Sequence, residues 1–471
     1  MPVTSLDLAR FIAEAMPGPG ALAAARTAIL DTLAVMLAGS VEDAAVRIGA
    51  TFEPLSARAG FPSFDPTVRL RAQDAALLYG TAAHALDYDD VSMLAICHPS
   101  APVLAALLAA KDWAKVSGAQ LAEAHAIGTE VTVRMGQAIG FSHYDMGFHA
   151  TATMGVFGAT AAVARLRGFT VAQTANALAI AASLASGLSL NFGSMMKPVH
   201  VGIAAANGLW AADWSHAGVE ASRDDLFGPR GVFDALSGGR QVKWPADVAL
   251  GRPFAIEKPG FELKRYPCCY MLHRIIALGR QVSEAGFDLG AIATLRVEMP
   301  RGGTRPLIHP FPVSGNQAMF SGPYTLLAAI VDGDVGFASF EYGAVTRAEI
   351  QSRLADVTIE EVAGPALTPE QIGAAAVRLT LDLRDGSTVR FERVAAPGSP
   401  ADPLGPDEQE AKWIDCICRA NPGLLPGAAA AHRLRTLEGL GSGLGSGALQ
   451  SWLGEMWRAA GRRTTIRAVS A

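Results

Sequence analysis

Long apolar runs rich in alanine dominate the first half of this chain. They cover residues 21–38, 75–85, 101–110, 150–165 and 171–188. Alanine has the highest helix propensity, and the larger apolar residues of 21–38 recur at roughly helical spacing before Gly39, a typical stop signal. Aromatic residues make up only 7% of the sequence, which disfavours a β-sandwich core. The sequence therefore predicts tightly packed helices and a mainly α fold.

The second half has a different pattern from about residue 260. Residues 294–299 and 377–383 alternate in polarity, and Asp385-Gly386 leads into 387–394 as a β-hairpin signal. Residues 356–362 predict a third strand, with helices at 273–285 and 324–332. A Pro-rich stretch at 396–406 closes this region, and short helices are expected from Trp413 onward. We expect an α+β domain at 261–404 and an all-helical domain formed by 1–260 and 405–471.

Charge and cysteine usage exclude some function classes. The net charge is −5 and no segment is strongly basic, so no nucleic-acid partner is expected. The N-terminus does not resemble a signal peptide, and other apolar runs are interrupted before membrane-spanning length, so no membrane partner is expected. The five cysteines form no C-x-x-C pair, which favours a reducing, cytoplasmic setting without a structural metal.

An acid-rich window lies between two of the predicted helices, at residues 84–100. It holds His84, Asp87, Asp89, Asp90 and His98. Asp89 and Asp90 could be simple turn residues, with His98 a satisfied partner. Clustered ionisable groups beside buried helices also mark sites of acid/base chemistry, and the sequence leaves both interpretations open.

Other polar residues invite a structural or a functional interpretation. Glu130 and Arg134 lie four apart on one helix, as an intrahelical ion pair would. His149 falls at a helix start, where the positive helix end favours a neutral imidazole or a bound anion. Lys197 precedes a proline, so we expect extended or turn backbone there, with His200 nearby. Residues 264–273 combine two cations, two thiols and an imidazole at the predicted domain junction.

Taken together, four stretches resemble the MmgE/PrpD family. They are His84-Ala-Leu-Asp-Tyr-Asp-Asp90 with His98-Pro-Ser-Ala-Pro-Val103, Gly147-Phe-His-Ala-Thr-Ala-Thr-Met-Gly-Val-Phe-Gly158, Asn191-Phe-Gly to Lys197-Pro-Val-His200, and Lys264-Arg-Tyr-Pro267 with His273. The family includes 2-methylcitrate dehydratase, cis-aconitate decarboxylase and iminodisuccinate epimerase. The resemblance implies a large helical domain built from both chain ends, a smaller α+β lid, a homodimer and no cofactor.

The resemblance also implies site residues. Asp87, His98, Lys197 and Lys264 fall on positions that look like active-site positions of the decarboxylase, and His149 matches a histidine common in the family. Two departures stand out: Val91 replaces a threonine of the relatives, and Cys269 stands where the decarboxylase has a second histidine. The motif at 98–102, with 191–195, looks nearer to the epimerase branch.

We therefore expect proton transfer next to a carboxylate of a small di- or tricarboxylic acid, without cofactor or metal. His98 is the expected general acid/base, oriented by Asp87, and Lys197 and Lys264 are expected to hold substrate carboxylates. Cys269 or His273 is expected to supply a second acid or base. Further substrate-binding candidates are His149, His200, Asp90 and Tyr144. Dehydration, epimerisation, decarboxylation and a family member without activity all remain open.

Overall fold

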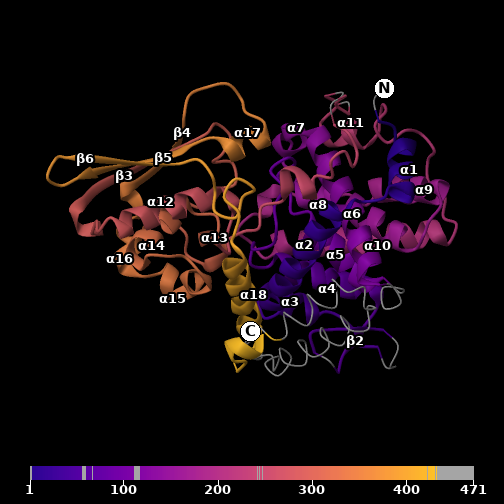
Figure 1. Cartoon of the computed structure of the whole chain (residues 1–471), viewed down its shortest axis with the longest axis horizontal. Coiled ribbons are helices and arrows are strands. Elements are labelled where there is room, and N and C mark those ends of the chain that lie inside the picture. The colour runs from indigo at the N-terminus through magenta and orange to yellow at the C-terminus, as the bar shows by residue number, and fades with distance from the viewer. Residues whose placement is uncertain are drawn as a thin grey trace. The chain divides into compact units, whose positions relative to one another are not determined.

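The computed structural model describes residues 3–55, 60–65, 67–110, 117–240, 242, 244–246, 248–421, 423–429 and 431. Two compact units make up the chain (Figure 1). Unit 1 comprises residues 1–189, 198–261 and 405–471, and unit 2 comprises 190–197 and 262–404. The short segment 190–197, which was predicted to lie in the helical domain, thus groups with the α+β unit. Short helices predicted beyond residue 431 lie outside the described residues.

Helices build unit 1. Along the chain they are α1 (Ser5–Glu14), α2 (Pro19–Gly39), α3 (Asp43–Gly49), α4 (Ala72–His84), α5 (Ser100–Ala109), α6 (Gly118–Ile139), α7 (Phe141–Asp145), α8 (Ala150–Leu166), α9 (Val171–Ala182), α10 (Met196–His216), α11 (Val232–Leu236) and α18 (Pro406–Ala420). A short antiparallel pair, β1 (Phe61–Pro62) and β2 (Arg69–Leu70), lies beside α4. The main packing partners are α6 with α8, α8 with α5, α5 with α4, α4 with α2, and α2 with α18.

Small residues allow the helices of unit 1 to approach closely. Gly158 on α8 faces α6, where an added Cβ would lie 1.8 Å from the Thr132 hydroxyl and 2.6 Å from the Gly128 carbonyl. Glycine is therefore required at this contact. The predicted helices at 21–38, 75–85, 101–110 and 150–165 are confirmed to within a few residues. The one predicted at 171–188 ends earlier, at Ala182.

An intrahelical ion pair on α6 confirms the structural interpretation of Glu130 and Arg134. The Arg134 Nε donates to Glu130 Oε1 at 2.8 Å. Glu130 also accepts from the backbone N–H groups of Gly251 at 2.8 Å and Ala255 at 2.6 Å. The pair thus ties the loop after residue 250 to a central helix.

The backbone at Lys197 differs from the prediction. We expected extended or turn conformation before Pro198, but α10 begins at Met196 and includes Lys197. A proline is tolerated in the first turn of a helix, because the N–H that it lacks would have no partner inside the helix. Residues before a proline usually avoid helical backbone, but Lys197 lies in the first turn of α10 and is helical.

A mixed four-stranded sheet forms unit 2. Its order is β4 (Val357–Glu361), β3 (Ile292–Met299), β5 (Val377–Leu383) and β6 (Thr388–Arg393), with β3 parallel to β4 and antiparallel to β5. The predicted hairpin is confirmed: β5 pairs with β6 around Gly386, whose φ is 88°. Helix α12 (His273–Glu284) packs against β5 and β6, and α14 (Gly322–Asp332) packs against α12 (Figure 1). Shorter helices are α13 (Gly315–Ala318), α15 (Tyr342–Val345), α16 (Ala348–Gln351) and α17 (Pro369–Ala374).

One described helix, α2, is long and apolar enough to span a membrane by length and composition. No such segment was expected from the sequence. The most apolar window of α2 is 72% buried inside the protein, and core helices of soluble proteins pass the same test, so the observation is weak evidence for a membrane span.

Candidate active site

The acid-rich window forms a compact turn between α4 and α5. Residues Ser92 and Cys97 close it with an antiparallel bridge. Asp87 has a φ of 47°, a left-handed conformation that residues with a side chain rarely adopt. The His98 N–H donates to the Thr151 hydroxyl at 3.1 Å, which fixes the end of the turn to α8. The turn is therefore shaped by contacts with neighbouring helices.

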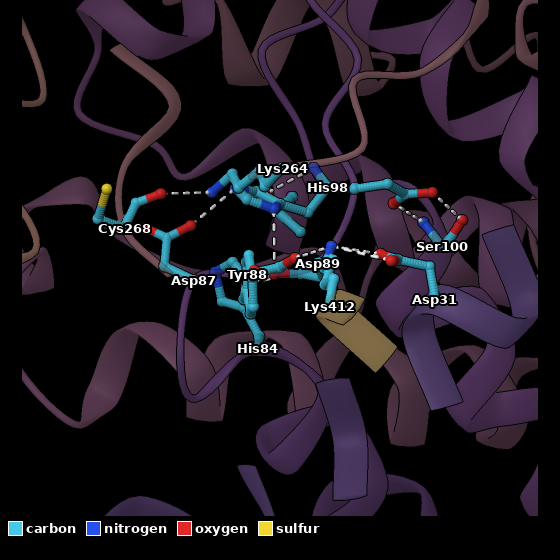
Figure 2. A network of polar contacts seen from close by, with 12 residues as sticks. Asp31, His84, Asp87, Tyr88, Asp89, His98, Ser100, Lys264, Cys268 and Lys412 are labelled. Atoms are coloured by element: carbon cyan, nitrogen blue, oxygen red, sulfur yellow. Dashed lines mark hydrogen bonds and ion pairs between the residues drawn. The ribbon is translucent and has the colours of Figure 1, made fainter. Parts of the chain in front are cut away.

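Four side chains of this turn and of α4, those of His84, Asp87, Asp89 and His98, form a compact group (Figure 2). His98 Nε2 lies 3.4 Å from Asp87 Oδ1, and its Nδ1 lies 3.3 Å from Asp89 Oδ1. His84 Nδ1 lies 2.9 Å from both oxygens of Asp89, and the two imidazoles meet edge to face at 4.4 Å between centroids. The His98 side chain is 12% exposed, whereas those of His84 and Asp89 are fully buried. His98 is thus the most accessible member of this group.

The electrostatics of this group favour a charged His98. Its Nε2 and Nδ1 lie 3.4 and 3.3 Å from carboxylate oxygens, and two carboxylates this close favour the positively charged form of the ring. Burial would raise the pKa of Asp89, but His84 and His98 outweigh burial and hold that pKa well below its usual value. Asp89 therefore remains ionised at neutral pH and stabilises a proton on its histidine neighbours.

Asp90 has a different environment from its neighbour. It accepts from the Ser100 backbone N–H at 3.2 Å and from the Ser100 hydroxyl, so it caps the start of α5. Burial, with repulsion from Asp89 and Asp31, raises the pKa of Asp90 to about 8 despite the bonds from Ser100. Asp90 is accordingly mostly protonated at neutral pH. These contacts support the structural interpretation that the sequence left open for Asp90.

A second pair of imidazoles lies close by. His149, directly before α8, and His200 on α10 are both buried, with their Nδ1 atoms 3.3 Å apart. One of the two must donate and the other accept, so the pair cannot hold protons on both Nδ1 atoms. The His149 ring lies 6.1 Å from the His84 ring, centroid to centroid. The structure thus brings His84, His98, His149 and His200 into one histidine-rich region of unit 1.

Tyr144, a further predicted substrate-binding residue, lies on the short helix α7. Its ring packs edge to face against Phe141 at 6.4 Å between centroids. This contact gives Tyr144 a packing role within the short helix α7 (Phe141–Asp145).

The remaining predicted site residues lie in unit 2. Lys264 is fully buried and donates to the Cys268 carbonyl at 3.0 Å. The Lys197 ammonium lies 5.6 Å from the Phe192 ring centroid and 5.2 Å from that of Phe320. Aromatic faces stabilise a partly desolvated cation. Both lysines are therefore held in buried, defined positions, and their role in binding a carboxylate stays a prediction.

The two alternatives for a second acid or base are both buried in unit 2. Cys269 directly precedes the 3-10 helix Tyr270–Leu272, and His273 is the first residue of α12. The His273 ring packs against the rings of Tyr266 and Tyr270, with centroid distances of 5.1 and 5.3 Å, and its Nδ1 lies 3.4 Å from the Pro397 carbonyl. These contacts fix the His273 ring in the core of unit 2.

A divalent metal could in principle use the same group of side chains. His84, Asp87, Asp89 and His98 each offer one ligand atom, and these atoms lie within 4.8 Å of one another. Two imidazoles and two carboxylates suit a zinc-like ion. The hydrogen-bonded arrangement and a metal-bound one compete for the same nitrogen and oxygen atoms.

One set of buried residues beside this turn was not predicted from the sequence. Lys412 on α18 reaches Asp31 on α2 at 2.9 Å and donates to the Tyr88 carbonyl at 3.0 Å (Figure 2). Trp413 also donates to Asp31, at 2.9 Å. The sequence signal was an aspartate in the middle of the apolar run 21–38. Its partner lies 381 residues away, and no local pattern could identify it.

Comparison with known proteins identifies relatives of this architecture. The chain is 27% identical over 364 residues to the cis-aconitate decarboxylase of Homo sapiens, covering 74% of this chain and 73% of the relative. It is 27% identical over 378 residues to a cis-aconitate decarboxylase-like protein of Aspergillus oryzae, covering 73% and 75%. It is 30% identical over 210 residues to the cis-aconitate decarboxylase of Aspergillus terreus, covering 42% and 43%. The resemblance to the epimerase branch stays a prediction.

Family models account for most of the chain. The MmgE/PrpD N-terminal domain matches residues 6–245, and the MmgE/PrpD C-terminal domain matches residues 266–422. The first match contains the acid-rich turn and the histidine-rich region, and the second contains the sheet of unit 2. With both domain models matched in order, this chain belongs to the MmgE/PrpD family.

Proposed function

We propose that this protein is a lyase that acts on a small polycarboxylate, with an unsaturated tricarboxylate such as cis-aconitate as the first candidate. The observation that carries the proposal is the position of His98 between Asp87 and Asp89, at 3.4 and 3.3 Å. The relatives named cis-aconitate decarboxylase support the choice of substrate.

The two carboxylates give His98 the role of a general acid. An imidazolium ion held by two anions is ready to deliver a proton, and the 12% exposure of its side chain leaves it accessible to a substrate. The fully buried Asp89 keeps its negative charge and cannot reach the substrate itself. The Nδ1 atom of His84 lies 2.9 Å from both oxygens of Asp89 and so fixes the orientation of that carboxylate.

Decarboxylation of an unsaturated tricarboxylate would use this acid once per turnover. The bond between one carboxylate and its methylene carbon breaks, carbon dioxide leaves, and the electron pair forms a new double bond. The electrons of the old double bond move to the carbon beside a remaining carboxylate, and that carbon takes the proton of His98. The neutral imidazole then regains a proton from water, so one proton is consumed for each carbon dioxide released.

Fixed positive charge is also needed, because negative charge builds up beside a carboxylate during this reaction. Lys197 and Lys264 are the candidates for this role, since both are buried and each ammonium has a defined position.

A histidine that is protonated at rest is less suited to epimerisation, which requires a base on each face of the carbon. Dehydration would use the same acid to protonate a leaving hydroxyl group.

The experiment is an incubation in D2O followed by proton NMR. The full-length protein is given cis-aconitate, citrate, 2-methylcitrate or iminodisuccinate in separate reactions. We expect a product of cis-aconitate that has lost one carboxylate and gained one deuterium beside a remaining carboxylate. His98→Asn is expected to lower the rate by about 10² to 10⁴, whereas His216→Asn, at an exposed position of α10, serves as the unaffected control.

Each outcome assigns the reaction. An epimer or simple exchange without loss of carbon dioxide would replace the lyase proposal by an isomerase. Loss of water from citrate or 2-methylcitrate would assign a dehydratase. Near-normal turnover by His98→Asn would overturn the role of His98, and inert substrates throughout would favour a family member without this activity.

A further inference from the structure

A buried lysine of the C-terminal helix contacts the turn that carries the candidate acid's two partners. Lys412 lies on α18, and its side chain is only 2% exposed. Its Nζ is 2.9 Å from Asp31, donates to the Tyr88 carbonyl at 3.0 Å and lies 4.2 Å from the Tyr88 ring centroid. The ammonium is thus held between α2 and a single residue of the turn.

Tyr88 is the residue that separates Asp87 from Asp89. The peptide groups on its two sides determine where these carboxylates point, and the carboxylates face opposite nitrogens of His98. Asp87 also has a φ of 47°, a strained conformation that persists only where the surrounding structure holds it. A bond to the carbonyl of the next residue is well placed to impose it.

We propose that Lys412 is a positioning residue: through the Tyr88 carbonyl it holds Asp87 and Asp89 at 3.4 and 3.3 Å from the two ring nitrogens of His98. This inference rests on the proposed function for its effect on catalysis, but its effect on His98 can be measured without a substrate. Asp31 holds the Lys412 ammonium in turn, and Trp413 fixes Asp31.

A merely structural role is the alternative, because α18 must also be attached to the helical unit. The chain offers a matched control for that role on the same helix. Arg419 pairs with Glu42 at 2.6 Å, which attaches α18 near α3. Loss of the Arg419 pair should weaken the docking of α18 while leaving the bond between Lys412 and Tyr88 in place.

The test compares Lys412→Met and Arg419→Met in full-length protein labelled with ¹⁵N-histidine, with His98→Asn used to assign the His98 ring signals. In Lys412→Met we expect the ring ¹⁵N signals of His98 to move away from their wild-type positions at about pH 7.5, because Asp87 and Asp89 no longer keep their places beside the ring. With cis-aconitate we expect kcat to fall by about 10- to 100-fold with KM within about twofold, since small misplacements of catalytic groups have effects of this size. Arg419→Met should lower Tm but keep the wild-type His98 signals and kcat.

The outcomes separate the two roles. Unchanged His98 signals in Lys412→Met, or equal changes in both variants, would overturn the inference. If Lys412→Met does not fold, Lys412→Gln, whose amide can still donate to the Tyr88 carbonyl, is expected to fold and to keep wild-type His98 signals. Changed His98 signals in Lys412→Gln would also overturn the inference. If wild-type protein does not turn over cis-aconitate, the proposed function fails while the NMR comparison still decides the role of Lys412.

Discussion

Replacing Asp89 by asparagine tests the electrostatic basis of the site. The Asp89→Asn change would keep the size of the side chain and an oxygen that can accept from His84, but it would remove the charge that lies 3.3 Å from His98 Nδ1. At an effective dielectric constant of about 20, two unit charges at that distance interact by roughly 5 kcal/mol. Because both charges are spread over several atoms, we take roughly 2–4 kcal/mol as the loss.

This loss translates into a rate and a pH dependence. A preference for the protonated ring that is weaker by roughly 2–4 kcal/mol corresponds to a decrease in kcat of about 30- to 1000-fold near neutral pH. The decrease should become smaller toward about pH 5.5, where solvent again protonates the imidazole. Steady-state rates with cis-aconitate between about pH 5.5 and 8.5 measure both effects. Turnover within about threefold of wild type, or a loss that does not vary with pH, would refute the reasoning.

A matched control is available for the removal of a buried carboxylate. Glu130 is fully buried and bonds Arg134 and two backbone N–H groups of the same unit. Glu130→Gln should lower the free energy of unfolding by about 3 kcal/mol, because it leaves a buried guanidinium without its counter-charge. The kcat of the folded fraction should stay at the wild-type value. A comparable catalytic loss in Glu130→Gln would mean that the effect of Asp89→Asn reflects general instability.

The remaining predictions concern stability and metals. Because the pKa of Asp90 is raised to about 8 in the folded state, the wild type loses up to about 1.4 kcal/mol of stability per pH unit between about pH 4 and 8, and Asp90→Asn should remove this loss. Urea unfolding of both proteins at about pH 5 and 8.5 checks this prediction. A stability difference between Asp90→Asn and wild type that is the same at both pH values would contradict it. Zn²⁺ should inhibit the enzyme more strongly as pH rises, because the metal ion must displace a proton from His98, and EDTA should restore the activity. Loss of activity on adding EDTA to protein without Zn²⁺ would contradict this prediction. Gly158→Ala should destabilise the contact of α8 with α6 by about 1–3 kcal/mol, seen as a lower Tm, and an unchanged Tm would contradict the packing argument.

Local patterns predicted much of the fold. The alanine-rich runs predicted α2, α4, α5 and α8, and the Asp385-Gly386 turn predicted the hairpin of β5 and β6. The intrahelical pair of Glu130 with Arg134 also followed from spacing alone. Such features depend on residues close in sequence, so a single sequence contains the information that determines them.

Long-range contacts explain most of what the sequence did not reveal. The parallel pairing of β3 with β4 joins strands that are distant in the chain, and strand patterns do not name their partners. Asp89 and Asp90 look alike in the sequence and both are buried. Two histidine neighbours nevertheless hold the pKa of Asp89 low, whereas burial raises the pKa of Asp90 despite its bonds from Ser100. The roles of neighbouring carboxylates thus depend on the tertiary environment.

The charge state of the His98 ring in the wild-type protein is the most direct test of the proposed site. Selective ¹⁵N-histidine labelling, with His98→Asn for assignment, reports whether each ring nitrogen carries a proton. The position between Asp87 and Asp89 predicts that both nitrogens of His98 are protonated at about pH 7.5. A ring with one unprotonated nitrogen at that pH would contradict the assignment of His98 as the resting acid.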